Sequence, residues 1–261
     1  MSGALELATD RFDGPEGAVP LIVLHGLYGS RRNWAALAKR WAQQRPVICV
    51  DLRNHGESPW ADRMDYAVMA ADILALIEAQ TTGRAALLGH SLGGKVAMAA
   101  ALSAPERIER LGVADIAPTA YQIGGFEPLD AMQALRPERF NKRSEAEAAL
   151  AETITDPATR RFLLSNLVRR DEGGFRWQLN LDAIAANRAT LLAFPRFETD
   201  RYDGPTLFLA GERSDYIAAR HWPDIEARFP LARQQVIPGA GHWIHADKPS
   251  ETMHVLSAFL S

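Results

Sequence analysis

The stretch Ala85-Ala86-Leu87-Leu88-Gly89-His90-Ser91-Leu92-Gly93-Gly94-Lys95-Val96-Ala97-Met98 decides the fold of this chain. A short apolar run is followed by a Gly-x-Ser-x-Gly element and then by an Ala-rich segment typical of a helix. Strand, tight turn and helix in this order form the context that a nucleophile elbow requires. Gly89 and Gly93 lack a Cβ, so the strand and the helix can approach closely around a strained serine backbone. The sequence therefore predicts that the Ser91 hydroxyl stands at the carboxyl edge of a sheet, above the positive end of a helix dipole.

The composition is that of a soluble globular protein, with 261 residues of which 47% are hydrophobic and 23% charged. A net charge of −3 gives no reason to expect nucleic acid as a partner. No apolar run approaches the ~18 residues of a membrane span, and the segment Met1–Glu6 lacks the features of a secretory signal. The single cysteine, Cys49, excludes an internal disulfide and a cysteine-rich metal site. We expect a cytoplasmic protein without a stable membrane anchor, either a monomer or a homodimer.

Apolar runs and helical patterns alternate along most of the chain. The runs predict strands, and the segments between them carry apolar residues at helical spacing. This alternation predicts an α/β fold with a mostly parallel sheet and helices on both of its faces. The predicted strands are Leu5–Phe12, Val19–Leu24, Val47–Val50, Ala85–Leu88, Arg110–Ala114, Thr206–Ala210 and Gln234–Ile237.

The alternation stops over one long internal segment. From about Thr119 to Arg201 only helical signals and loops are found, including a helix predicted from Leu181 to Leu192. A helical insertion of about 80 residues between two strands of one sheet indicates a cap over the edge of that sheet. We therefore predict a core formed by residues 1–118 and 202–261 and a helical cap formed by residues 119–201.

Several polar residues directly follow predicted strands. Ligands of open α/β sheets bind beyond the carboxyl ends of the strands, so these residues are expected to converge there. A serine hydroxyl is a weak nucleophile and needs a base within hydrogen-bond reach, usually a histidine held by a carboxylate. The residues in question are His25, Gly26, Leu27, Asp51, Ser91, Asp115, Asp215 and His242.

Among the seven histidines, His242 is predicted to be the base. It lies in the glycine-containing loop Pro238–Trp243 after the last predicted strand, and it completes the chain order Ser, Asp, His of this architecture. The side chains of consecutive residues point in different directions, so we expect His90 to be a wall or support residue of the site. We assign His25, His90 and Trp243 to substrate binding, although for His25, in a glycine-flanked turn, structural hydrogen bonding is the favoured alternative.

Two aspartates compete to orient the histidine. Asp215 stands shortly after the strand ending at Ala210, which is the usual place for the acid in this architecture, and we favour it. Asp115 ends the strand next to the elbow strand and could reach the same imidazole from the other side. The choice stays open at this point.

The oxyanion of an acyl-transfer reaction needs hydrogen-bond donors. The backbone N–H of Leu92, directly after the nucleophile, is one predicted donor. The second is the backbone N–H of Leu27, from the turn after an earlier strand.

These motifs resemble those of the α/β-hydrolase superfamily across essentially the whole chain. Four stretches are similar to the bacterial YbfF-type esterases and their abhydrolase-domain relatives. Within them, Arg53-Asn54-His55-Gly56 and Gly94-Lys95 are the more discriminating motifs, since many hydrolases have Arg-Gly-His-Gly in place of Arg53-Asn54-His55-Gly56. The four stretches are His25–Ser30 with Asn33-Trp34, Asp51–Ser58, Gly89–Lys95 and Asp115–Pro118. The resemblance implies the α/β-hydrolase fold with a cap inserted after the sixth strand, and hydrolysis of esters or thioesters without a metal or an organic cofactor. It also implies the acid role for Asp115, because the subfamily often lacks an aspartate in the stretch that matches Gly211–Tyr216. This sequence differs from that pattern, since it has both Asp115 and Asp215.

The predicted activity is that of a serine hydrolase that cleaves a small-molecule acyl ester or thioester through an acyl-enzyme intermediate. Ser91 excludes a haloalkane dehalogenase or an epoxide hydrolase, both of which need a carboxylate nucleophile. A perhydrolase or haloperoxidase, a lactonase or a C–C hydrolase on the same triad stays open, as does a ligand receptor with slow turnover.

Overall fold

The computed structural model describes residues 3–122 and 125–260, and a seven-stranded sheet forms its centre. The strand order is β1-β3-β2-β4-β5-β8-β9, and only β1 pairs antiparallel with its neighbour. The predicted mostly parallel α/β sheet is therefore confirmed. The strands are β1 (Thr9–Phe12), β2 (Leu21–Leu24), β3 (Val47–Val50), β4 (Ala85–His90), β5 (Ile108–Ala114), β8 (Thr206–Gly211) and β9 (Ala232–Ile237).

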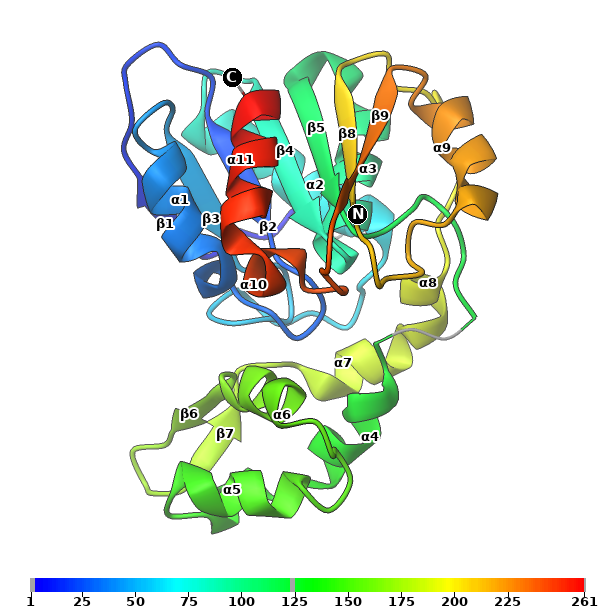
Figure 1. The fold of residues 1–261 in the computed structure, drawn as a ribbon. Coiled ribbons are helices and arrows are strands. Elements are labelled where there is room, and N and C mark those ends of the chain that lie inside the picture. Colours follow the sequence, from blue (N-terminus) through cyan, green and yellow to red (C-terminus); the bar gives the residue numbers. More distant parts are fainter. Residues whose placement is uncertain (1–2, 123–124, 261) are drawn as a thin grey trace.

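Helices cover both faces of this sheet (Figure 1). One face packs on α1 (Ala35–Trp41) and α11 (Pro249–Leu260), the other on α2 (Tyr66–Gln80), α3 (Leu92–Ser103) and α9 (Trp222–Arg228). Successive strand residues point to opposite faces: in β2, Leu21 and Val23 belong to the first core and Ile22 and Leu24 to the second. Because both cores exclude water, the central strands are continuous apolar runs. The short remaining helices of the core are η1 (Arg31–Trp34), η2 (Pro105–Arg107), η4 (Ala219–His221) and α10 (Ile244–Asp247).

The segment between β5 and β8 forms a second lobe on the side of the sheet where the parallel strands end (Figure 1). The insertion follows the fifth strand of the described chain and not the sixth, because a single strand, β1, precedes β2. The helix predicted from Leu181 to Leu192 is two helices, α7 and α8. The helices of this lobe are α4 (Glu127–Ala134), η3 (Pro137–Arg139), α5 (Arg143–Leu150), α6 (Pro157–Leu164), α7 (Leu181–Ala186) and α8 (Arg188–Leu192).

The lobe also contains a hairpin that was not predicted. Strands β6 (Leu167–Arg169) and β7 (Phe175–Trp177) pair antiparallel, so the expectation of helices and loops alone was wrong. Gly173 and Gly174 have φ angles of 94° and 72° in the turn between the strands, a conformation that favours glycine. Strands of three residues are too short for an alternating pattern to stand out in the sequence.

The elbow between β4 and α3 depends on two glycines. A Cβ on Gly89 would lie 2.1 Å from the carbonyl oxygen of Gly93, and a Cβ on Gly93 would lie 2.5 Å from the carbonyl oxygen of His25. Both obstacles are main-chain atoms, which cannot move aside as the end of a side chain can. Gly89 therefore allows β4 and α3 to approach this closely, and Gly93 allows α3 to approach the end of β2.

We expect Gly93→Ala to lower the free energy of unfolding by about 3 kcal/mol or more, since overpacking against backbone must displace the whole helix. Urea unfolding followed by circular dichroism measures the change. Gly112→Ala in β5 is the matched control, because the nearest atom there is Leu88 Cδ1 at 3.0 Å, the end of a flexible side chain. Equal losses in the two variants would contradict the argument.

Candidate active site

Ser91 occupies the turn between β4 and α3. Its φ of 51° and ψ of −118° lie in a region that residues with a side chain seldom adopt. The main chain on both sides holds this conformation: the Ser91 N–H donates to Ala114 O at 3.0 Å, and the Ser91 carbonyl accepts from Lys95 N at 3.1 Å. In the part of the chain that the structure describes, the Ser91 hydroxyl makes no hydrogen bond. It is half-buried and lines a cavity.

His242 lies in the loop after β9 and is oriented by Asp115. The His242 Nδ1–H donates to Asp115 Oδ2 at 2.7 Å. Asp115 is fully buried, with a φ of 53° directly after β5. Gly211 N donates to its Oδ1 at 3.0 Å, and the Ser214 hydroxyl donates to Oδ2. Three donors thus fix the carboxylate, and the proton on Nδ1 leaves the Nε2 lone pair of His242 free to accept a proton.

Asp215, which the sequence favoured as the acid, does not reach the histidine. Its side chain is exposed and takes part in no hydrogen bond among residues 3–122 and 125–260. The loop after β8 instead turns Ser214 toward Asp115. The geometry thus favours Asp115 as the acid, which is the alternative that the sequence left open. Asp115 follows β5, the direct neighbour of the elbow strand β4, and β8 lies one strand further away.

Two aromatic residues hold the His242 loop in place. His90 Nε2–H donates to the His242 carbonyl at 2.8 Å, so His90 supports the backbone of the loop while its ring forms a wall of the cavity. Burial holds the pKa of His90 well below its usual value, which keeps the ring neutral. The ring of Tyr216 stacks on His242 with 4.2 Å between centroids. No sequence signal singles out Tyr216, and its contact with His242 was not predicted.

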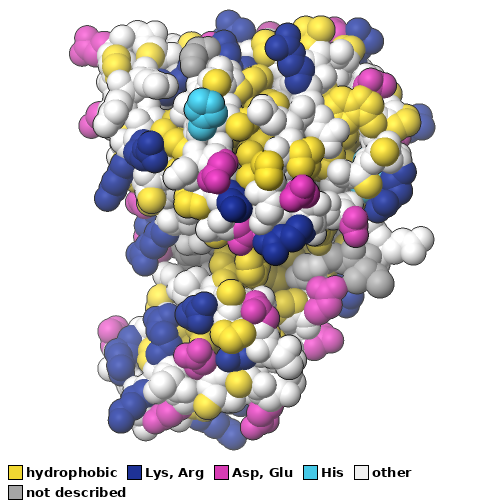
Figure 2. All heavy atoms as spheres, in the orientation of Figure 1, with side chains coloured by type: hydrophobic (Ala, Val, Ile, Leu, Met, Phe, Trp, Pro, Cys, Tyr) yellow, Lys and Arg dark blue, Asp and Glu magenta, His cyan; other side chains and the backbone are white. Residues whose placement is uncertain are grey.

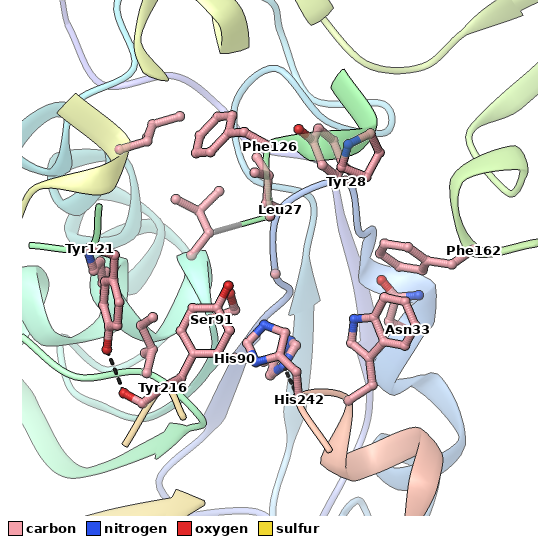
Figure 3. A pocket seen from close by; sticks show the side chains of 18 of the residues that line it. Leu27, Tyr28, Asn33, His90, Ser91, Tyr121, Phe126, Phe162, Tyr216 and His242 are labelled. Carbon is pink, nitrogen blue, oxygen red and sulfur yellow. Dashed lines mark hydrogen bonds between the residues drawn. The ribbon is translucent and has the colours of Figure 1, made fainter. Parts of the chain in front are cut away.

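The backbone N–H groups of Leu27 and Leu92 belong to residues that line the cavity. Ser91 and His242 line the same cavity, and Figure 3 shows Leu27 beside them. Leu92 is the first residue of α3, and the first N–H groups of a helix have no partner within the helix. Neither N–H donates a hydrogen bond within the described residues, so both are free for an anionic oxygen.

Of the three residues assigned to substrate binding, His90 and Trp243 line the cavity and His25 does not. His25 is buried, its Nδ1–H donates to Gly26 O at 2.8 Å, and its Nε2 accepts from Leu52 N at 3.0 Å. Both ring nitrogens are therefore occupied in holding two turns together. The assignment of His25 to substrate binding was wrong, and the alternative role in structural hydrogen bonding describes this residue.

The cavity lies at the junction of the two lobes, where hydrophobic side chains gather on the surface (Figure 2). It has a volume of about 140 Å³. Within the described ranges no group of three or more histidine, cysteine, aspartate or glutamate side chains is arranged to hold a metal ion. No helix there has both the length and the apolar character needed to cross a membrane. The residues that line it include Leu27, Tyr66, His90, Ser91, Leu92, Lys95, Ile116, Tyr121, Phe126, Phe162, Leu191, Leu192, Tyr216, His242 and Trp243.

Comparison with known proteins gives consistent matches. The model of the alpha/beta hydrolase fold family matches residues 19–249. An sn-1-specific diacylglycerol lipase, ABHD11 of Xenopus laevis, is 40% identical over 98% of this chain and 84% of its own length. Esterase YbfF of Escherichia coli K12 is 32% identical over 93% of both chains. A solved structure titled "Marine microorganism esterase" has a TM-score of 0.94 and 37% identity, and covers 98% of this chain and 100% of its own.

The buried histidines predict a pH dependence of stability. His55 is fully buried, its Nδ1–H donates to Arg53 O at 3.0 Å, and its Nε2 accepts from Tyr28 N at 3.2 Å, so a second proton would face an N–H group. Burial, the largest cause, lowers the pKa of His55 to about 3. The unfolded chain binds this proton near pH 6.5 and the folded chain does not, so stability is complete above pH 6.5 and falls as the pH drops toward 3.

We expect His55 to contribute a loss of about 1.4 kcal/mol per pH unit below pH 6.5. Urea unfolding at pH 7.5, 6.5, 5.5 and 4.5 gives the slope. His55→Gln removes the titrating group, so its slope is expected to be shallower by that amount. Parallel slopes for the two proteins would mean that His55 is not neutral in the folded state.

Proposed function

The chain belongs to the alpha/beta hydrolase fold family, and from this premise we propose that it is a carboxylic ester hydrolase acting through Ser91, His242 and Asp115. One observation supports this assignment above the others. The hydrogen bond from His242 to the buried Asp115 accompanies a strained serine whose hydroxyl is unpaired in the described residues, and serine and histidine line one cavity. Nucleophile, base and orienting acid are the three parts that such catalysis needs.

In the proposed mechanism His242 Nε2 takes the proton of Ser91 as Oγ attacks the ester carbonyl. Asp115 stabilises the imidazolium that forms, and the N–H groups of Leu27 and Leu92 donate to the oxyanion. His242 then protonates the departing alcohol. A water molecule, deprotonated by the same imidazole, attacks the acyl-enzyme, and the collapse of the second oxyanion releases the carboxylic acid and restores the Ser91 hydroxyl.

We propose that residues 119–201 act as the cap of this site. Phe126 and Phe162 come from this segment and line the cavity, so the cap supplies apolar surface against the substrate. Relatives named as a diacylglycerol lipase and an esterase support a small acyl ester as the substrate. Thioesters stay an alternative. The cytoplasmic location and the monomeric or homodimeric state stay predictions.

Replacement of the nucleophile tests the proposal directly. We expect Ser91→Ala to lower kcat on p-nitrophenyl butanoate by about a thousandfold or more, because the acyl-enzyme can no longer form. The absorbance of the released nitrophenolate, followed over time, measures kcat. The same comparison with butanoyl-CoA and a thiol reagent tests thioesters. Equal rates for the variant and the wild type would overturn the serine mechanism.

A matched pair of substitutions decides which aspartate is the acid. Asp115→Asn is expected to lower kcat by about 10³- to 10⁴-fold, since it removes the acceptor that fixes the histidine tautomer. Asp215→Asn changes an exposed side chain and is expected to leave kcat within about twofold. A larger fall in Asp215→Asn than in Asp115→Asn would contradict the geometry described above.

A further inference from the structure

The carboxyl end of α8 is held by an unusual set of donors. The last carbonyls of a helix have no partner within the helix, and here three successive ones are bonded from outside. Tyr66 Oη donates to Leu191 O at 2.6 Å, and Lys95 Nζ donates to Leu192 O at 3.0 Å and to Ala193 O at 2.8 Å. The Tyr121 N–H adds a second bond to Leu192 O at 3.0 Å. We call Tyr66, Lys95 and the Tyr121 N–H the carbonyl clamp.

The two side chains of the carbonyl clamp belong to the core. Tyr66 begins α2, and Lys95 lies one turn after the nucleophile in α3, the helix that carries the oxyanion donor Leu92. Both are almost completely buried. The carbonyl clamp therefore ties the end of the inserted segment to the same helix that positions the catalytic serine.

Lys95 is buried without a charged partner. In the described part of the chain no carboxylate lies within 4 Å of its Nζ, and the rings of Tyr121 and Tyr66 stand at 4.9 and 5.5 Å. Desolvation lowers its pKa to about 7. An ammonium has three N–H donors and a neutral amine has two, so both carbonyls stay bonded in either state. The side chain thus acts as a double hydrogen-bond donor to the end of α8, and an acid to neutralise it is not required.

The residues held by the carbonyl clamp form part of the cavity wall. Leu191 and Leu192 line the cavity together with Ser91, Tyr66 and Lys95. Figure 3 places Tyr121 on one side of Ser91 and Phe162 and Asn33 on the other, with His242 between Ser91 and Asn33. The Tyr121 N–H donates to Leu192 O, so the two leucines lie on the Tyr121 side of Ser91, and we take this side as the acyl side.

We infer that the carbonyl clamp fixes Leu191 and Leu192 as the end of the acyl pocket and so restricts the enzyme to short acyl chains. This inference rests on the proposed function. The volume of about 140 Å³ supports it, because cavities of about this size hold a molecule such as benzene. An acyl chain of four carbons is of that order, whereas one of eight or more requires the end of α8 to move. Tyr66 and Lys95 are therefore specificity-determining residues that act through the two leucines.

The test compares acyl-length profiles of the wild type, Tyr66→Phe and Lys95→Met with p-nitrophenyl butanoate, hexanoate and octanoate. Both substitutions keep nearly the same volume. Tyr66→Phe removes one donor, and Lys95→Met removes the Nζ donors together with their charge, so a change shared by the two variants reports the lost hydrogen bonds. Tyr202→Phe is the matched control, because Tyr202 is an equally buried tyrosine whose hydroxyl donates to a backbone carbonyl, Ile108 O, at 3.2 Å, and it does not line the cavity. The quantity measured is kcat/KM for octanoate divided by kcat/KM for butanoate.

The wild type and Tyr202→Phe are expected to prefer butanoate by about tenfold or more, and each clamp variant is expected to raise the octanoate-to-butanoate ratio by about tenfold. A wild type that cleaves octanoate as fast as butanoate overturns the inference even if no variant folds. A ratio in both clamp variants within twofold of the wild type also overturns it. Failure of the proposed function itself is distinguishable: no ester is cleaved, and a fluorophosphonate does not label Ser91.

Discussion

The close approach of β4 and α3 is the constraint on which the rest of the site depends. With Gly89 and Gly93 in main-chain contact, the turn between them is so tight that Ser91 takes a positive φ. This conformation raises the hydroxyl out of the sheet and points the first N–H groups of α3 at the same space. One steric requirement therefore places the proposed nucleophile and one oxyanion donor together. The helix that begins there also carries Lys95, which ties the end of α8 to this centre.

The proposed acid is positioned by a second requirement, the satisfaction of a buried carboxylate. Asp115 is fully enclosed, and an ionised group in such a place must be hydrogen-bonded. Gly211 N and the Ser214 hydroxyl come from the next strand of the sheet and its loop, and His242 Nδ1 from the loop after the last one. Three strands of the parallel sheet thus meet at one side chain. Burial would be costly for an unpaired acid. Here the hydrogen bonds that satisfy the buried carboxylate also orient the imidazole of His242.

The central strands, the elbow and the position of His242 could be predicted because each has a local signature: a continuous apolar run, a Gly-x-Ser-x-Gly motif and a glycine-containing loop after a strand. The acid could not be decided in this way. Two aspartates follow strands, and only the register of the loop after β8 shows that Ser214 and not Asp215 turns inward. His25 was misassigned for a related reason. It lies in a turn next to the site, but its side chain only bonds backbone groups and so supports the site without facing the cavity. The β6–β7 hairpin was missed because three-residue strands carry no period.

The motif Arg53-Asn54-His55-Gly56 owes its distinctive character to structure and not to catalysis. Arg53 donates from Nε and from a terminal nitrogen to the two carboxylate oxygens of the buried Asp72, at 2.7 and 2.8 Å. Asn54 has a φ of 65°, a left-handed conformation that favours glycine, and asparagine is among the few other residues that tolerate it.

Unlike glycine, Asn54 brings a side chain. Its Oδ1 accepts from Ala61 N at 2.8 Å and from Asn180 Nδ2 at 3.1 Å, and its carbonyl accepts from Asn180 N at 3.0 Å. Asn180 caps α7 of the inserted segment. Asparagine at this position thus allows the turn and adds a tie between the core and the segment proposed as the cap. This tie is independent of the bonds at the end of α8, so the inserted segment is fastened to the core at both ends of its α7–α8 helix pair.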